Sequence, residues 1–249
     1  MKKTVLGSSL LAAVLLVLSG CTSVTTFDYT NAQGTLAVFQ EKGIATKTIT
    51  VLPFLDQRGA KYFSSTRPAG DHGSFYLGFI PLVPAGFVDK EEPENSVDFV
   101  TSGRFHFDVA HDLSNAAAVS LKASNLFKEV TKGNNIDQVK SDYIWRGIVT
   151  NTYYTGWMYS YCITYFFAPA LWVFGAPFGT SENELWVQFE LIDCKTGKAV
   201  WHYDYRGHDS ITHWLYARIG KDTSMYPQLM KQAMNSALNN LSRTLPTLQ

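Results

Sequence analysis

A long uncharged run in the second half of the chain limits the folds that this sequence can adopt. No Asp, Glu, Lys, Arg or His occurs from Gly147 to Ser181, and the centre of the run, Trp157 to Phe178, contains nine aromatic residues. The centre is long enough to cross a bilayer as a helix. However, prolines and a glycine interrupt it, and its Tyr and Trp content is typical of membrane interfaces and protein contacts. We therefore expect an aromatic insertion in a folded domain, at about residues 156–180.

Three interpretations of this aromatic run remain open. It can fold into the protein's own core or beneath a second apolar loop, Phe75 to Val88. It can be a docking surface for a membrane or a partner protein, which an exposed apolar patch of this size would require. It can also be a pore-forming hairpin, although Phe166 to Phe174 lacks the alternation that a barrel strand needs. The second interpretation predicts these contact residues: Trp157, Tyr161, Phe166, Phe167, Trp172, Phe174, Phe178, Phe79 and Ile80.

The amino terminus has the three parts of a lipoprotein signal. Two lysines precede an uncharged stretch, Leu6 to Leu18, that is too short to cross a bilayer as a helix. Leu18-Ser19-Gly20-Cys21 resembles the lipobox of bacterial lipoproteins, in which the Cys receives a diacylglyceryl group and its freed amine is acylated, as with palmitate. We expect residues 1–20 to be the signal peptide and several acyl chains to anchor Cys21 stably.

The residue after the lipidated Cys suggests a destination. In enterobacterial lipoproteins an Asp at this position favours retention in the inner membrane. Thr22 occupies the position here, which resembles the pattern sorted to the outer membrane. We therefore expect a protein that is lipid-anchored in the bacterial outer membrane through Cys21 and that faces the periplasm.

The charge balance excludes one class of partner. The chain of 249 residues has 21 basic and 21 acidic residues, and loss of the two signal-peptide lysines leaves the mature chain at −2. A nucleic-acid binder should be basic, so we expect no nucleic-acid partner. Charged residues make up only 17% of the chain and hydrophobic residues 46%, which together predict a folded domain with an unusually apolar segment.

Hydrophobic periodicity divides the mature chain into a tether and one domain. Residues 21–45 are mostly small and polar, which predicts a tether with room for one short strand, and residues 46–249 are expected to form a single periplasmic domain. The expected strands are residues 48–54, 99–108, 126–130, 143–155, 185–191 and 200–206, and the expected helices are residues 109–127 and 225–244. This order predicts an α/β (α+β) fold, in which helices pack on a mixed β-sheet and apolar loops are inserted.

Local signals predict where several of these elements end. Asn125 stands where the first helix should stop, and Asn tolerates the left-handed conformation used there. The turn from Asp193 to Gly197 predicts a β-hairpin, and Trp201 and two tyrosines share one face of its second strand. Pro227 is tolerable only in the first turn of the last helix.

Four short motifs resemble periplasmic lipoproteins related to the amino-terminal domain of TolB. This broad group includes the curli secretion lipoprotein and the penicillin-binding-protein activator lipoproteins. The motifs are Val51–Arg58 in the first strand, Ala116–Val130 over the helix and its exit, Asp142–Ile148 in the central strand and Leu191–Trp201 in the hairpin. Together with the carboxy-terminal helix they cover most of residues 46–245. The resemblance implies a fold like that of the TolB amino-terminal domain and an envelope location.

Members of this group are mostly adaptors, activators or secretion components without enzymatic activity. The resemblance therefore implies an adaptor or assembly factor of the cell envelope that binds another envelope protein and uses no cofactor. Two alternatives stay open, an oligomeric pore or secretion component and a periplasmic metal-dependent hydrolase.

The polar clusters in the sequence predict no catalytic or metal site. His202 to His208 places alternate polar side chains on one strand face, but Arg206 in the middle of that row opposes a cation. Asp56 and Arg58 are expected to pair across a turn in a structural role. The chain contains none of the common nucleophile, zinc or phosphate-binding motifs.

Two cysteines remain after Cys21 is assigned to lipid. An exported compartment permits a disulfide between Cys162 and Cys194. The alternative is two buried, inert thiols, because spacing in the sequence does not determine the distance between them.

Overall fold

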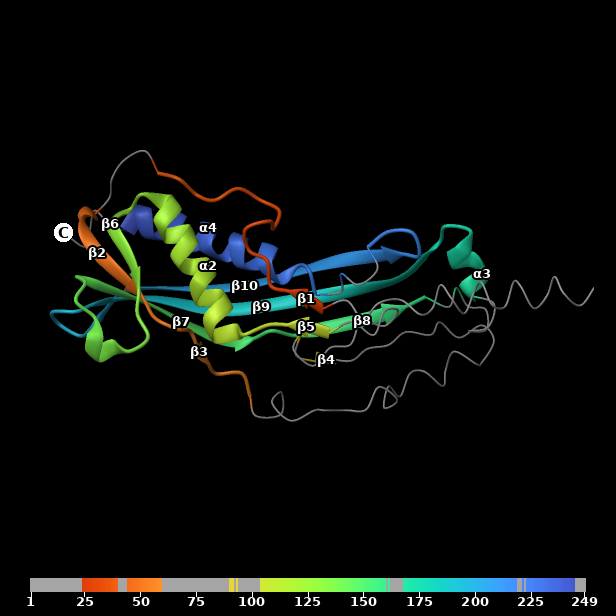
Figure 1. Ribbon diagram of the computed structural model, residues 1–249, viewed down its shortest axis with the longest axis horizontal. Coiled ribbons are helices and arrows are strands. Elements are labelled where there is room, and N and C mark those ends of the chain that lie inside the picture. Colours follow the sequence, from red (N-terminus) through yellow and green to blue (C-terminus); the bar gives the residue numbers. More distant parts are fainter. Residues whose placement is uncertain are drawn as a thin grey trace, which may run out of the picture.

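The computed structural model describes residues 24–39, 44–59, 90–91, 93, 104–159, 161, 168–218, 221 and 223–244. It shows an elongated molecule in which helices cover one half of a long curled sheet, while the other half projects beyond them (Figure 1). The main sheet has eight strands, both parallel and antiparallel. The predicted class, a mixed sheet with helices packed on it, is therefore confirmed.

The main sheet is built around β9 (Pro177–Asp193). On one side β9 pairs along its length with antiparallel β10 (Ala199–Trp214). On the other side it pairs with β8 (Tyr154–Met158) and then with β7 (Tyr143–Asn151), both antiparallel. Parallel strands continue the sheet from β7 through β2 to β6, while β3 pairs with β7 and β4 with β8. These last strands are β2 (Ile44–Val51), β3 (Leu55–Asp56), β4 (Lys90–Glu91) and β6 (Phe127–Lys132).

Helix α2 (Val109–Ser124) begins and ends as its sequence indicates. Asp108 is the N-cap, and its carboxylate accepts a hydrogen bond of 3.1 Å from the backbone N–H of His111. This bond satisfies an N–H group that has no partner within the helix. Asn125 ends the helix in the left-handed conformation, with a φ of 59°, so the predicted stop is confirmed.

Helix α4 (Tyr226–Thr244) covers the inner half of the β9–β10 hairpin, with Pro227 in its first turn as predicted. Its apolar stripe faces a stack of aromatic rings on the sheet. In this stack Trp145 lies 5.4 Å from Phe189 and 5.5 Å from Trp201, measured between ring centroids. The buried stripe is Tyr226, Leu229, Met230, Ala233, Met234, Ala237, Leu238 and Leu241.

Reciprocal hydrogen bonds set the register between β2 and β7 just before their first paired residues, Ile49 and Tyr143. The carboxylate of Asp142 accepts from the backbone N–H of Thr48 at 2.9 Å and from its hydroxyl at 3.1 Å, and that hydroxyl accepts from the Asp142 N–H at 3.0 Å. The backbone N–H of Thr48 is the main reason why the pKa of Asp142 is lower than usual, and Lys47 adds to the effect. The Asp-Tyr motif of the central strand therefore has a structural role.

A close contact explains the glycine in the same strand. A Cβ atom on Gly147 would lie 2.4 Å from the ring of Phe54, which is itself 3% exposed. The backbone N–H of Phe54 donates to the carbonyl of Ala110 in α2 at 3.0 Å. The chain after β2 therefore runs beside β7 and against the start of α2, and the glycine leaves room for the Phe54 ring.

Three elements in or next to the uncharged run differ from their predictions. The hairpin extends to Pro177 and Trp214, because buried polar side chains such as Ser181 and Asn183 continue the strand without an apolar signal. Part of the run forms a short helix, α3 (Ala168–Val173), which the sequence analysis did not predict. Pro169 lies in the first turn, where no N–H is required. The strand expected over residues 143–155 is divided into β7 and β8.

The segment expected to be a free tether is docked on the helices over most of its length. We call residues 24–39 the N-terminal strap; it runs over α2 and α4 (Figure 1). It begins with β1 (Val24–Thr26), which pairs in parallel with β5 (Arg104–His106). Tyr29 is 7% exposed, its hydroxyl bonds the hydroxyl of Ser120 in α2, and burial raises its pKa to about 12.

Two side chains on successive turns of α4 hold the strap by its backbone. Lys231 is 5% exposed, and its Nζ donates to the carbonyls of Ala32 at 2.7 Å and Gly34 at 3.3 Å. The carboxamide of Asn235 accepts from the N–H of Ala37 at 2.9 Å. The prediction of a tether over residues 21–45 therefore needs correction for this part. Small polar residues dock here because their backbone groups make the contacts.

Candidate functional site

The outer half of the β9–β10 hairpin extends beyond the helix that covers its inner half. The 17 residues of β9 span about 55 Å, whereas the 19 residues of α4 span about 28 Å. A helix of this length leaves about half of the hairpin without α4 against it, although side chains such as Asn183 and His213 are buried there too. Among the residues that the structure describes, no helix is long and apolar enough to cross a membrane.

Most of the exposed apolar side chains belong to α3 or to segments bonded near it, and α3 lies at this end of the molecule (Figure 1). Of the ten large hydrophobic side chains that are exposed in the described part of the chain, six lie here. Phe174 is 87% exposed and Tyr216 71% exposed. We call this surface the aromatic tip; its members are Tyr159, Tyr161, Leu171, Val173, Phe174 and Tyr216.

Hydrogen bonds attach the aromatic tip to β9. The hydroxyls of Tyr159 and Thr180 lie 2.7 Å apart, and the hydroxyl of Tyr161 donates to the carbonyl of Pro177. The indole Nε1 of Trp172 donates to the carbonyl of Tyr159 at 3.2 Å. Partial burial raises the pKa of Tyr161. These polar ends bond within the protein, so the tip presents mainly its apolar atoms to the outside.

Tyr216 joins the tip from the loop after β10, and sequence reasoning missed it. Its hydroxyl donates to the carbonyl of Val173 in α3 at 2.7 Å. Tyr216 lies far outside the uncharged run, so composition does not connect the two. The pairing of β10 with β9, which continues as far as Trp214, returns this loop to the base of α3.

A buried polar network supports the tip from beneath. His213 is 1% exposed; its Nε2 lies 2.8 Å from the hydroxyl of Ser181 and its Nδ1 lies 2.9 Å from the carbonyl of Arg218. A carbonyl only accepts, so Nδ1 donates and Nε2 accepts from Ser181. Ser181 is also 1% exposed. Burial of both side chains makes this Ser–His pair a support for the hairpin end.

The predicted contact residues lie at different depths. Tyr161 and Phe174 are exposed, and Trp172 is half-buried. Phe178 is 6% exposed and stacks on His213 at 5.6 Å, so it packs in the core instead of offering a contact. Outside the described residues lie Phe79, Ile80, Phe166, Phe167 and the side chain of Trp157.

A polar hollow of about 610 Å³ lies between the strap, the end of β10 and the start of α4. Arg218 lines it and also lies over the ring of Trp214, with 5.8 Å from its Cζ to the ring centroid. Cationic groups therefore lie just behind the aromatic tip. Other side chains that line the hollow are Asp28, Gln33, Lys221 and Gln228.

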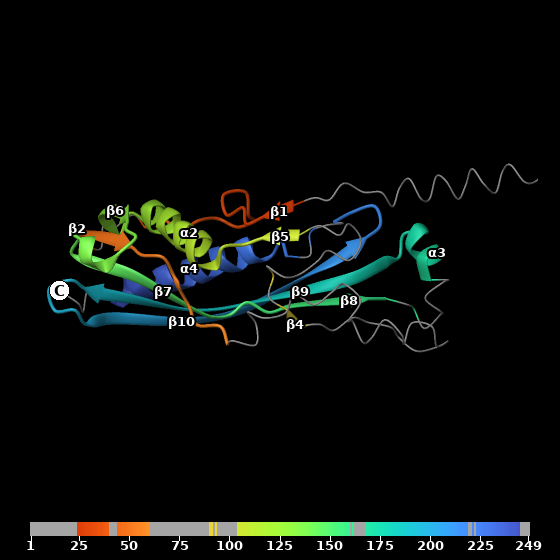
Figure 2. The same cartoon turned by 60° about the horizontal axis from the view of Figure 1, so that its bottom comes forward.

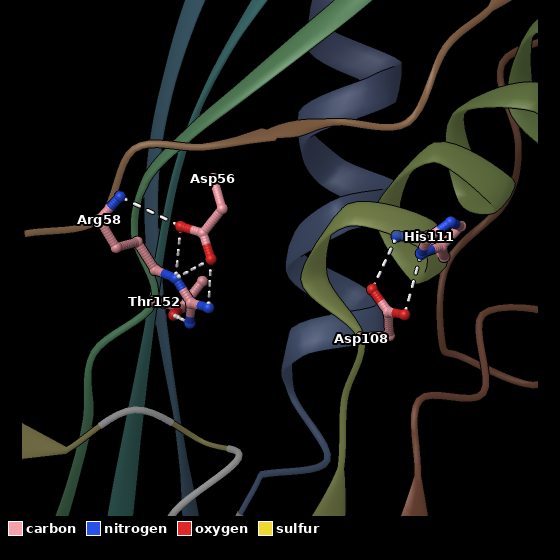
Figure 3. Close-up of polar contacts among 5 residues, drawn as sticks. All are labelled: Asp56, Arg58, Asp108, His111 and Thr152. Atoms are coloured by element: carbon pink, nitrogen blue, oxygen red, sulfur yellow. Dashed lines mark hydrogen bonds and ion pairs between the residues drawn. The ribbon is translucent and has the colours of Figure 1, made fainter. Parts of the chain in front are cut away.

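An ion pair ties the end of β3 to the β7–β8 turn (Figure 3). Arg58 is 7% exposed and binds the carboxylate of Asp56 through Nε at 2.9 Å and through Nη2 at 2.7 Å. Its Nη1 donates to the hydroxyl of Thr152 at 2.6 Å. The predicted pairing is confirmed, and its contacts are those of a structural tie.

A second pair in Figure 3 caps α2 and lies at the surface. The ring Nδ1 of His111 lies 2.9 Å from the carboxylate of Asp108. Partial burial raises the pKa of Asp108, but the hydrogen bonds from His111 outweigh it, so the net shift is downward. The predicted polar row of β10 is exposed, and Arg206 lies over the ring of Trp186. In the described ranges, no three His, Cys, Asp or Glu side chains are placed to hold a metal ion.

Of the three cysteines, Cys194 alone lies among the residues that the structure describes. Cys194 is an exposed free thiol in the β9–β10 turn, and partial burial raises its pKa. Cys21 and Cys162 lie outside the described residues, so the lipidation and the disulfide both stay predictions.

Comparisons with known proteins find distant structural neighbours. No family model and no curated protein matches the chain. A DUF330 protein from Xanthomonas campestris is 9% identical, with a TM-score of 0.41 over 90% of this chain and 95% of that one. A PelC dodecamer from Paraburkholderia phytofirmans is 14% identical, with a TM-score of 0.35 over 85% and 93%. A minor lipoprotein from Acinetobacter baumannii is 9% identical, with a TM-score of 0.29 over 81% and 92%.

These neighbours are bacterial proteins, and one of them is named as a lipoprotein. Similarity at this level identifies no family for the chain. It also leaves the resemblance to the TolB amino-terminal domain as a prediction from the motifs.

Proposed function

We propose that this protein is a lipoprotein of the bacterial outer membrane that faces the periplasm and acts as a non-enzymatic adaptor or assembly factor for another envelope protein. The aromatic tip carries this proposal. An apolar surface that is held rigidly by internal hydrogen bonds and is exposed at the end of a long hairpin needs an occupant. The lipobox at Cys21 supports the membrane location.

The contacts of the ionisable side chains support a binding role over a catalytic one. Arg58 joins two strands, Asp142 sets a register and Lys231 holds the strap. His213 and Ser181 are buried beneath the tip. In the described part of the chain, the charged groups with the most contacts are thus engaged in holding the fold.

The anchoring part of the proposal is tested by fractionation. We expect Cys21→Ala to move the protein from the membrane fraction to the soluble periplasmic fraction, because the acyl chains can no longer form. Unchanged membrane association of this variant would contradict anchoring through Cys21.

The adaptor part is tested by crosslinking in intact cells, followed by identification of the adduct. We expect one envelope protein to crosslink to the wild type and to Ile136→Asp, a matched exposed substitution on the loop between β6 and β7. The adduct should be lost in Cys21→Ala, because the partner meets the protein at the membrane. Crosslinking to no envelope protein in the wild type would contradict an adaptor role.

A further inference from the structure

We infer that the aromatic tip inserts into the same membrane leaflet that holds the acyl chains of Cys21. The protein then contacts the bilayer at two points, one covalent and one through side chains. This inference rests on the proposed lipid anchoring and names the occupant of the tip. It follows from the position of the strap, the direction of β1, the length of β9 and the chemistry of the tip.

The docked strap leaves a short link to the membrane. β1 begins at Val24, which pairs with Arg104, and only Thr22 and Ser23 separate it from Cys21. Three chain steps of about 3.5 Å allow Cys21 to lie at most about 10 Å from Val24. An anchored molecule is therefore held against the bilayer surface instead of hanging from a long tether.

The direction of β1 places this link on the side of the tip. β1 runs parallel to β5, and β5 continues through Phe107 and Asp108 into α2. Helices α2 and α3 lie toward opposite ends of the molecule (Figure 2). Both strands therefore run away from α3, and Val24 is at the end of β1 that is nearer to the tip.

The hairpin reaches farther than the link. Phe105 of β5 stacks on Tyr226 at 6.2 Å, and the hydroxyl of Tyr226 donates to the carbonyl of Tyr153 at 2.8 Å. That carbonyl also accepts from the N–H of Glu184 in β9, so β1 and β5 lie near the level of Glu184. From Glu184 to Pro177 the strand extends for about 23 Å more. The outer end of the hairpin therefore extends farther than the link to Cys21. In an orientation in which the hairpin points toward the bilayer, the tip reaches the bilayer surface.

The chemistry of the tip changes along the hairpin in the order expected at a membrane interface. Leu171 and Phe174 offer apolar atoms, and no charged residue occurs in the whole run from Gly147 to Ser181. Tyr and Trp side chains surround them, as in the aromatic belts of membrane proteins. Arg218 and Lys221 lie in the loop just behind, where they can meet phosphate groups.

The short link also explains why the leaflet is the occupant that we infer. Linking two contacts makes the second one intramolecular, so the bilayer is present near the tip at a high effective concentration. Insertion of apolar side chains by about 5–10 Å into the boundary between headgroups and acyl chains is typical of interfacial anchors.

The test uses the full-length lipidated protein in vesicles of phosphatidylethanolamine and phosphatidylglycerol. An environment-sensitive fluorophore is attached to Phe174→Cys, and in a second sample to Tyr216→Cys, each in a chain that carries Cys162→Ser and Cys194→Ser. The matched control carries the fluorophore on the native Cys194, in a chain with Cys162→Ser. Cys194 is an exposed thiol at the opposite end of the same hairpin.

We expect blue-shifted emission at both tip positions and strong quenching by lipids brominated high on the acyl chain. The probe on Cys194 should keep the emission of a water-exposed dye and should be quenched by iodide. Equal iodide quenching at all three positions would overturn the inference.

Flotation of the same vesicles separates the two proposals. Protein that floats while its tip probes stay in water still has its lipid anchor. This result would refute the insertion of the tip but not the lipid anchoring. Protein that does not float contradicts the anchoring of the proposed function as well. A crosslink in cells from position 174 to a protein, with no lipid contact, would show that the tip serves the adaptor role by binding a protein.

Discussion

The two halves of the β9–β10 hairpin have the same backbone pairing but differ in the segments that lie next to them. In the inner half, Leu185, Val187 and Phe189 are at most 1% exposed, and the apolar stripe of α4 packs against that face. In the outer half, Asn183 and His213 are also at most 1% exposed, whereas the apolar side chains around α3 at its end are largely exposed, with Phe174 at 87%. The difference lies in what covers the strands, because the ladder of hydrogen bonds continues through both halves.

This contrast follows from the geometry of the elements. A strand rises about 3.3 Å per residue and a helix only about 1.5 Å, so a helix and a strand of similar length cannot cover each other. With 19 residues, α4 is too short for a strand of 17 residues. The outer half therefore has to be stabilised locally, by the His213 network and by the tyrosine hydrogen bonds. Its remaining apolar atoms are available for contacts outside the protein.

The largest expected effect is a loss of stability, and it is measured by comparing one substitution in α4 with one in the aromatic tip. Leu229→Ala, in the fully buried stripe of α4, should lower the free energy of unfolding by about 2–5 kcal/mol, because it leaves a cavity in a packed core. Phe174→Ala should change it by no more than about 0.5 kcal/mol, as expected for an exposed side chain. Urea denaturation measures both. A large loss of stability for Phe174→Ala would show that the tip is part of the core.

The next prediction tests whether the N-terminal strap is held against α4, which packs on the inner half of the hairpin. Lys231→Met keeps most of the aliphatic side chain but leaves two strap carbonyls without their donor, which should cost about 1–3 kcal/mol. Limited proteolysis should then cut within residues 24–39 before it cuts the sheet. Lys122→Met, an exposed lysine on α2, is the matched control and should leave the cleavage rate unchanged. Equal cleavage of both variants would mean that the strap is not held by Lys231.

The smallest effect concerns the sheet end that lies opposite the tip. Asp142→Asn should lower the free energy of unfolding by about 1 kcal/mol at neutral pH, because the carboxylate accepts two hydrogen bonds from Thr48. Those bonds lower the pKa of Asp142 in the folded state, so its contribution is present above the unfolded pKa and is lost as the pH falls through the folded pKa.

The difference between the wild type and Asp142→Asn should therefore shrink as the pH drops below about 4. Denaturation curves at several pH values measure it, with the exposed Asp137→Asn as the control. A difference that stays constant down to low pH would exclude the charged carboxylate as its cause.

Sequence patterns predicted the elements in which neighbouring residues carry the signal. The stripe of α4, the stop at Asn125 and the turn after Asp193 depend on periodicity or on one residue's local preference. The strap could not be predicted in this way, because Lys231 binds its carbonyls, which every sequence has. Tyr216 was missed for a related reason, since its contact with Val173 joins two segments that are distant in the sequence.

The sequence by itself determined the class of the fold, the ends of its helices, the hairpin and the presence of one uncharged aromatic segment. Periodicity, turn chemistry and composition are local properties, and the chain carries them before it folds. Only the tertiary structure decided which part of that segment is buried and which is exposed. Burial depends on what packs against each side chain. Phe178 stacks on His213 and is buried, whereas Phe174, four residues earlier, is exposed.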